Sequence, residues 1–152
     1  MRRDWARFNR VAIRLACVGL AGALAAACGG RTKAEHVLDP ANELPFGLID
    51  TPTQGAQVPT QVMFAGWALD DRGIREVRLY VDAHIAEVVQ LNTARPDVSK
   101  AYPQYARGTH LHGWTTSVVF YVPGPHTLIA QAVDTDGAKR DIGTLAITSI
   151  DK

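Results

Sequence analysis

Short apolar runs alternate with polar positions from Leu44 to the end of the chain, and Gly, Pro and Asp separate these runs. The alternation is clearest in Ile74–Asp82, where Val77, Leu79 and Val81 fall on one side of an extended strand. The segments that predict strands are Phe46–Asp50, Thr60–Leu69, Ile74–Asp82, Ile85–Leu91, Trp114–Val122, His126–Val133 and Asp141–Ile150. No segment keeps a helical period, so the pattern predicts an all-β antiparallel sandwich of about seven strands.

The same alternation predicts which side chains face the core. The expected inward positions are Val62, Phe64, Ala68, Val118, Phe120, Val122, Leu128, Ala130, Ala132, Leu145 and Ile147. On the second strand, Met63, Ala65 and Trp67 fall on the opposite face. We expect a tight hairpin at Ala83-His84 and a turn at Pro123–Pro125.

The first residues have the pattern of a secretory leader. A basic stretch opens the chain, with Arg2, Arg3, Arg7, Arg10 and Arg14 opposed only by Asp4. The uncharged segment Leu15–Ala27 follows and is rich in small and apolar residues. At about 13 residues it is too short to cross a membrane as a helix, which needs about 20.

The leader ends in Leu24-Ala25-Ala26-Ala27-Cys28, which resembles the lipobox of bacterial lipoproteins. The resemblance implies that Cys28 carries acyl chains such as palmitate and becomes the mature N-terminus. The leucine stands four residues before the cysteine, where the usual pattern has three, and Ala25-x-Ala27 also suits ordinary secretion. Gly29-Gly30 lacks the aspartate associated with inner-membrane retention, which favours the outer membrane in a cell that has one.

These features divide the chain into a signal peptide (1–27), a lipidated cysteine with a flexible tether (28–43) and a β-sandwich (44–152). The leader carries five arginines and one aspartate, so its removal changes the formal charge from +1 to −3. No basic patch remains, which argues against nucleic acid as a partner. Cys28 is the only cysteine after the leader, so the domain has no disulfide and depends on its core.

Several motifs in order carry a family resemblance. They are Gly47–Pro52, Gly66–Asp70, Gly73-Ile74, Val81-Asp82, Arg95–Val98, Ala101–Pro103, Gly113-Trp114 and Gly124–Asp134. Together they resemble an immunoglobulin-like module of bacterial surface proteins, and the resemblance covers nearly all of Phe46–Ile150. It implies a non-catalytic appendage at the cell surface, because such modules occur in surface and glycan-related proteins. A fold by itself does not determine function.

Two turns are rich in aspartate, one with Asp70 and Asp71 and the other with Asp134 and Asp136. Hard oxygen ligands beside a glycine are what Ca²⁺ sites use, so these four residues are candidate calcium ligands. The alternative is that Asp and Gly only satisfy the turns themselves. In an immunoglobulin topology the two turns lie at the same end of the sandwich.

The long segment 92–113 is the second candidate site, since loops of this length are functional or contain structure of their own. Pro96 can open a helical turn, with Asp97 near its N-terminus and Pro103 at its end. One alternative is that Tyr102 and Tyr105 cap the core. The other is that the segment contacts a ligand or partner through Arg95, Asp97, Tyr102, Tyr105, Arg107 and Trp114.

Catalytic and metal-binding patterns are weak. His110-x-His112 would face one way on a strand, but a metal site needs a third ligand from His36, His84 or His126. The chain has no Gly-x-Ser-x-Gly elbow and no phosphate-binding glycine loop. The sequence therefore favours a protein that is not an enzyme and has no cofactor apart from the candidate calcium.

We expect a non-enzymatic envelope lipoprotein, anchored in the membrane by lipid, whose immunoglobulin-like domain mediates recognition or assembly with an envelope protein or glycan. One alternative is a carbohydrate-binding module that stacks sugars on Trp114, Tyr102 and Tyr105. Another is a calcium-stiffened structural spacer. Ordinary secretion is the alternative to membrane anchoring.

Overall fold

A computed structural model describes residues 41–151; the leader, Cys28 and most of the tether lie outside them. The strands are β1 (Phe46–Thr51), β2 (Gln57–Pro59), β3 (Gln61–Leu69), β4 (Ile74–Val81), β5 (His84–Val89), β6 (Thr93–Ala94), β7 (Leu111–Val119), β8 (Gly124–Asp134) and β9 (Lys139–Ile150). Between β6 and β7 lie a helix, α1 (Pro96–Ala101), and a 3-10 turn, η1 (Pro103–Tyr105). Within this part of the chain, no helix is long and apolar enough to cross a membrane.

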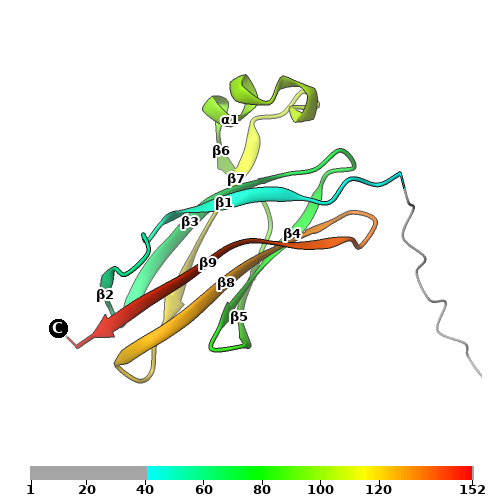
Figure 1. Ribbon diagram of the computed structural model, residues 1–152. Helices are drawn as coiled ribbons and strands as arrows, with labels where there is room; N and C mark the ends of the chain where they lie inside the picture. The colour runs from blue at the N-terminus through cyan, green and yellow to red at the C-terminus, as the bar shows by residue number, and fades with distance from the viewer. Residues whose placement is uncertain (1–40, 152) are drawn as a thin grey trace, which may run out of the picture. The chain divides into compact units, whose positions relative to one another are not determined.

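The strands form two sheets, as Figure 1 shows. One has the order β1-β3-β7-β6 and the other β2-β9-β8-β4-β5. Neighbouring strands are antiparallel, except that β2 pairs parallel with β9. If the short strands β2 and β6 are left out, the first, second and fifth strands (β1, β3 and β7) share one sheet, which is the immunoglobulin-like order. The prediction of an all-β sandwich is confirmed.

The core lies between the two sheets and follows the alternation of the strands. Its buried side chains include Phe64 and Ala68 from β3, Val77 and Leu79 from β4, Trp114 and Val118 from β7, and Leu128, Ala130 and Ala132 from β8. Each fully buried large apolar side chain contributes roughly 1.5–3 kcal/mol to stability. The hydrophobic core therefore holds the sheets together without any disulfide.

Trp114 packs directly over the backbone of Gly66, its partner across the β3–β7 ladder. A Cβ atom at Gly66 would lie 2.4 Å from Trp114 Cζ2 and 2.3 Å from the carbonyl oxygen of Leu48. Both distances are far below van der Waals contact, so only glycine fits there. The indole ring fills the space that the missing side chain leaves.

The predicted boundaries were wrong around β7. This strand covers Leu111–Val119 instead of Trp114–Val122, because the chain turns out of the sheet after Phe120. Val122 was expected in the core but is 68% exposed. The alternation predicts a buried face only as far as a strand stays paired. The short strands β2 and β6 were also missed, since strands of two or three residues carry no periodic signal.

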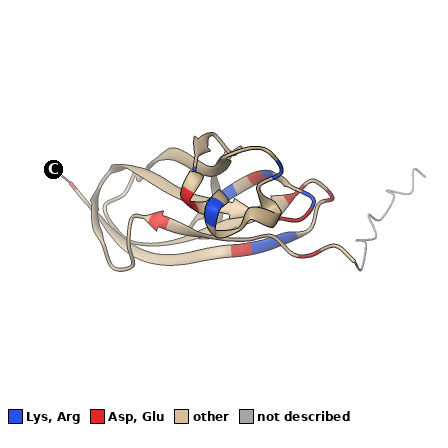
Figure 2. Cartoon of the chain, turned by 90° about the horizontal axis from the view of Figure 1, so that it is seen from above, with Lys and Arg blue, Asp and Glu red and all other residues tan. Residues whose placement is uncertain are grey.

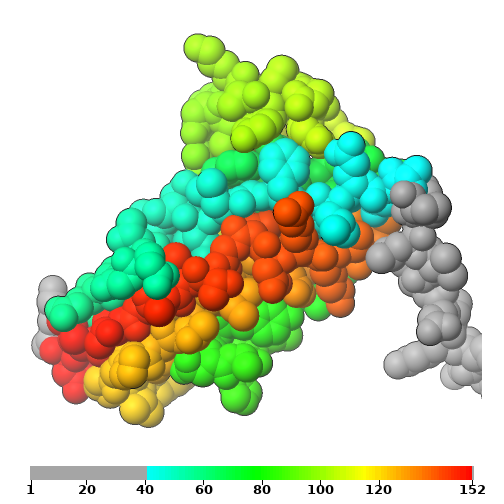
Figure 3. Space-filling view, in the orientation of Figure 1, coloured from blue at the N-terminus to red at the C-terminus, as the bar shows by residue number. Residues whose placement is uncertain are grey.

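The long segment 92–113 folds into a cap over the outer face of the sheet β1-β3-β7-β6, where it forms a separate lobe in Figure 3. The predicted helical turn between Pro96 and Pro103 is confirmed. Val98, Tyr102 and Tyr105 pack on Trp67 and Leu69 in a second apolar cluster. The outward-facing Trp67 is therefore buried beneath the cap.

His126 helps close the end of the sandwich opposite the β3–β4 turn. Its ring stacks on Phe120, with the ring centres 4.6 Å apart. Nε2 lies 2.9 Å from the carbonyl oxygen of Val122, and Nδ1 lies 2.7 Å from Asp82 Oδ2. The hydrogen bond with His126 lowers the pKa of Asp82 below its usual value. His126 is thus a structural residue.

We predict that Gly66→Ala lowers the free energy of unfolding by about 3 kcal/mol, because the new methyl group collides with a backbone oxygen and a fixed indole ring. Gly143→Ala is the matched variant. The three atoms nearest to its Cβ all belong to the Ile49 side chain, the nearest at 2.8 Å, and that side chain can rotate, so we expect a loss of about 1 kcal/mol. Urea denaturation measures both, and equal losses would contradict the proposed role of Gly66.

Candidate functional site

The two aspartate-rich turns, residues 70–73 and 134–138, lie side by side at one end of the sandwich. We call this end the cavity end, because a cavity lies beside the first of these turns. The backbone N–H of Thr135 donates to the carbonyl oxygen of Gly73 over 2.9 Å, and Arg72 Nη1 lies 3.4 Å from Asp136 Oδ2. In Figure 2 the charged residues gather toward this end and the cap. Gly73 and Gly137 have positive φ angles of 102° and 91°, which these tight turns require.

Asp134 and Asp70 each use an oxygen to build the turns. Asp134 is fully buried, and its Oδ1 accepts a hydrogen bond from the N–H of Ala138 over 2.8 Å. Its Oδ2 accepts one from Asn42 Nδ2 over 2.6 Å. Asp70 Oδ1 accepts two, from the N–H groups of Arg72 and Gly73. These contacts close both turns and attach the start of the domain to them.

The four predicted calcium ligands do not converge on a common point. Arg72 contacts both Asp71 and Asp136, while protein donors occupy both oxygens of Asp134. Among residues 41–151, no three or more His, Cys, Asp or Glu side chains are placed to hold a metal ion. The turns and Arg72 use several oxygens of this set, and calcium binding by these four residues stays a prediction.

The predicted histidine cluster does not form either. His110 Nδ1 lies 2.8 Å from Ser99 Oγ, at the cap. His84 opens β5 in the β4–β5 hairpin, and His126 lies at the opposite end of the sandwich. His36 lies outside the described residues. Only His112 is buried in the part of the chain that the structure describes.

The charged residues of the cap hold it in place. The Arg95 guanidinium contacts Asp50 Oδ2 at 2.5 Å and Asp97 Oδ2 at 2.7 Å. The hydrogen bond from Arg95 lowers the pKa of Asp97 to about 2. Arg95 therefore links the start of α1 to β1 across the sheet surface.

The aromatic residues of the cap are mostly engaged as well. Tyr102 packs edge-on against Phe46, with ring centres 5.4 Å apart, and Tyr105 donates a hydrogen bond to Glu43 Oε2 over 2.8 Å. Trp114, expected in the recognition surface, is fully buried in the core. The prediction of a sugar-stacking platform is therefore wrong, because the Trp114 ring, one of its three, is inaccessible to solvent. Of the six predicted contact residues, Arg107 is left exposed beside a cavity.

That cavity has a volume of about 450 Å³ and lies where the chain crosses from one sheet to the other. Its walls come from both sheets and from the end of the cap, and include Leu69, Ile74, Leu91, Leu111, Tyr105 and Arg107. Two buried polar side chains, Asp70 and His112, also line it. The size is within the range of small-molecule sites, which are mostly apolar with a few polar groups.

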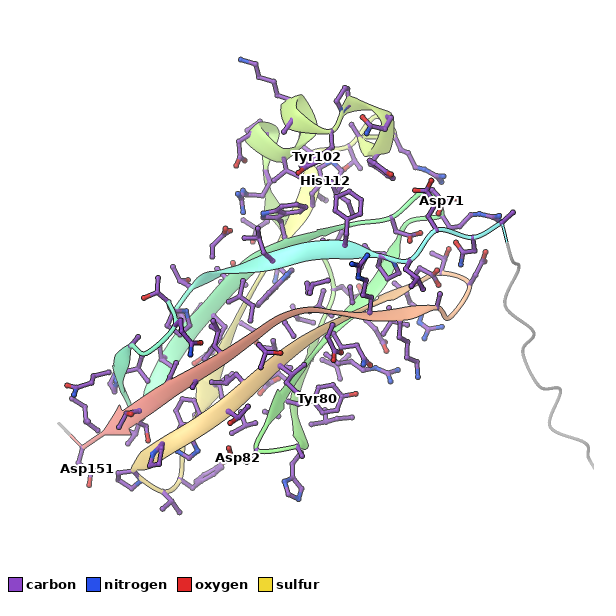
Figure 4. All side chains as sticks on the ribbon, in the orientation of Figure 1. Asp71, Tyr80, Asp82, Tyr102, His112 and Asp151 are labelled. Atoms are coloured by element: carbon purple, nitrogen blue, oxygen red, sulfur yellow. The ribbon has the colours of Figure 1, made fainter. Side chains whose placement is uncertain are left out.

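Asp70 and His112 each have one buried side-chain atom that lacks a hydrogen-bond partner. Asp70 is 3% exposed and His112 is 4% exposed, yet Asp70 Oδ2 and His112 Nε2 make no hydrogen bond. Asp70 Oδ1 accepts hydrogen bonds from the backbone N–H groups of Arg72 and Gly73, which fix this side chain directly after β3. His112 is the second residue of β7 and lies close to the cap (Figure 4). Trp67 and Gly113 are the last pair of the β3–β7 ladder, and Asp70 and His112 lie beyond this pair on neighbouring strands, where both line the cavity.

Burial shifts both groups toward their neutral forms. Desolvation raises the pKa of Asp70 above 3.8, and the nearby carboxylates of Asp134 and Asp71 raise it further, against hydrogen bonds from Arg72 and Gly73. Desolvation lowers the pKa of His112 below 6.5. Groups with shifted pKa values in a cavity mark a candidate functional site.

Sequence reasoning missed this pair, although a signal was present. Asp70 shares the alternation of Phe64 and Ala68, and His112 shares that of Trp114 and Val118. Both are polar residues at inward-facing positions, where apolar residues are expected. The sequence placed Asp70 in a calcium set and His112 in a metal pair, and only the pairing of β3 with β7 brings both to one cavity.

We predict that Asp70→Asn stabilises the protein by on the order of 1 kcal/mol at pH 7, because it removes a buried charge and keeps the turn. A raised folded-state pKa means that wild-type stability falls as pH rises from 3.8 through the higher folded value. The gain should therefore vanish well below pH 3.8. Urea denaturation at several pH values measures it, and a loss of stability at pH 7 would refute the assignment.

No protein-family model matches this chain, and no curated protein matches it. Distant structural similarities exist. The fibronectin(III)-like modules of CbhA from Clostridium thermocellum are 16% identical with a TM-score of 0.45, over 72% of this chain and 47% of that one. Dimeric latent PorU from Porphyromonas gingivalis is 16% identical with a TM-score of 0.47, over 72% of this chain and 10% of that one.

A mutant of the SrpA adhesin from Streptococcus sanguinis is 13% identical with a TM-score of 0.41, over 72% of this chain and 60% of that one. The chain thus spans about half of the CbhA chain and a tenth of the PorU chain. These similarities are too distant to assign the chain to a family or to transfer a function to it.

Proposed function

We propose that this chain is an exported, non-enzymatic envelope protein, anchored by lipid on Cys28, whose β-sandwich binds a small ligand or partner group in the cavity between β3, β4 and β7. The leader and the lipobox-like sequence support export and anchoring. The cavity with Asp70 and His112 supports binding.

The observation that carries the binding role is the pair of unpartnered buried polar atoms. Leaving a buried donor or acceptor unsatisfied costs about 1–3 kcal/mol. The β3–β4 turn uses only Asp70 Oδ1, so no hydrogen bond of the turn offsets the cost of burying Asp70 Oδ2 or His112 Nε2. A ligand that supplies the missing hydrogen bonds would explain why the protein keeps these two polar groups buried.

The cavity end is also where the chain enters the domain. Asn42 donates to Asp134, and Tyr105 donates to Glu43, so the start of the domain is attached to the turns and to the cap. The C-terminus emerges at the opposite end, as Figure 1 shows. A tether attached to the membrane would therefore join the domain at the end that carries the cavity.

Lipid anchoring makes a direct prediction. Cys28→Ser should move the protein from the membrane fraction to the soluble fraction and abolish labelling by a palmitate analogue, because the acyl chains are lost. Cys17→Ser is the matched control, since Cys17 leaves with the leader, and it should change neither result. Unchanged membrane partitioning of Cys28→Ser would overturn the anchoring.

Ligand binding in the cavity makes a second prediction. Leu111→Trp, at a residue that is 49% exposed and lines the cavity, should block the site with little effect on the fold. Leu48→Trp is the matched control, at a residue that is 42% exposed on β1 and does not line the cavity.

The measurement is the melting temperature of the full exported chain with and without the small-molecule fraction of an envelope extract. Wild type and Leu48→Trp should be stabilised by several degrees, because a ligand that binds only the folded state stabilises it, and Leu111→Trp should not. Equal shifts for all three proteins would place binding outside the cavity. The absence of a shift in any of them would contradict the binding role.

A further inference from the structure

We propose that the cavity binds a small organic amine, whose ammonium group pairs with the Asp70 carboxylate while its apolar part lies against Leu69, Ile74 and Leu91. This rests on the proposed function and names the ligand class of that site.

The cavity end has a surplus of acceptors. Besides Asp70 Oδ2, the buried atoms Asp71 Oδ1 and Asn42 Oδ1 have no hydrogen-bond partner. All three are oxygens that accept and cannot donate while the carboxylates are ionised. A ligand for Asp70 must therefore bring N–H or O–H donors, and a cation is favoured because Asp71 and Asp134 add negative charge nearby.

His112 is compatible with a cationic ligand. Its ring is neutral at pH 7, because burial lowers its pKa, so it adds no positive charge to the cavity. Nε2 has no hydrogen-bond partner, and His112 lines the same cavity as Asp70. In the tautomer with a lone pair on Nε2 it can accept a second hydrogen bond from the same ammonium group.

The walls favour an organic cation over a metal ion. A volume of about 450 Å³ is far larger than one ion, and leucine and isoleucine side chains supply much of the lining. Within residues 41–151, no set of three His, Cys, Asp or Glu residues can hold a metal. A metal would leave the apolar walls empty, whereas an amine with a hydrocarbon body covers them.

The arginines at the cavity set the orientation of the ligand. Arg75 and Arg107 line the cavity, and both residues are exposed to solvent. They would repel a cation near the opening. The ammonium group therefore lies inward at the buried Asp70, and the outer end of the ligand is neutral or acidic.

The test uses three probes with one cyclohexyl body: cyclohexylamine, cyclohexanol and cyclohexanecarboxylate. Each is titrated into the full exported chain at pH 7, and binding is followed by chemical-shift changes of backbone amides. We expect the amine to shift the amides of residues 69–74 and 112, and to bind at least tenfold more tightly than the alcohol or the carboxylate.

Two variants test whether the Asp70 carboxylate is the charge that binds the amine. Asp70→Asn should weaken binding of cyclohexylamine at least tenfold. We expect this variant to stay folded, because asparagine keeps the oxygen that closes the turn. Asp141→Asn is the matched control, with the same change of charge on an exposed residue of β9 that does not line the cavity. It should weaken binding less than threefold.

Several results would overturn the proposal. Equal binding of the alcohol would show a purely apolar site, and tighter binding of the carboxylate would assign the cavity to an anion on the arginines. Shifts of the same amides by CaCl₂, with none from the amine, would replace it with a calcium site. If the amine fails but Leu111→Trp still abolishes stabilisation by envelope extract, only the ligand class is wrong and the binding cavity stands.

Discussion

The contact between the Trp114 indole and the bare backbone of Gly66 is the constraint on which the rest of this structure depends. It lies inside the sandwich, where β3 and β7 are neighbours, and the ring occupies the volume that any side chain at position 66 would need. The next residue, Trp67, points the other way and supports the cap. Two consecutive residues of β3 therefore organise both apolar clusters of the domain.

This arrangement explains why the long crossover is ordered. With Trp67 exposed, the outer face of the sheet would carry a large apolar ring, so the cap removes it from water with Val98, Tyr102 and Tyr105. Arg95 then connects the cap to β1 through Asp50. Residues that resemble a recognition surface in the sequence mainly attach the cap, and the space left at its end forms one wall of the cavity.

The cavity end differs from the rest of the core in its chemistry. Asp70, His112 and Asp134 all occupy inward-facing positions at the ends of their strands, where the remainder of the sandwich has Phe, Ala, Val and Leu. Asp134 is satisfied by local donors, whereas Asp70 and His112 keep one atom each without a partner. A site that lowers stability in this way is typical of positions maintained for function.

The sequence by itself determined where the seven longer strands lie, to within a few residues, because alternation with one buried face determines which side chains point inward. It also determined the helical turn after Pro96 and the aspartate turns, whose conformations depend on neighbouring residues. It did not determine that Trp114 is buried, that Val122 is exposed, or that Asp70 and His112 line one cavity. Those facts depend on where a strand leaves its sheet and on contacts between residues more than forty positions apart. The pairing of strands distant in the sequence and the packing of the two sheets decide them.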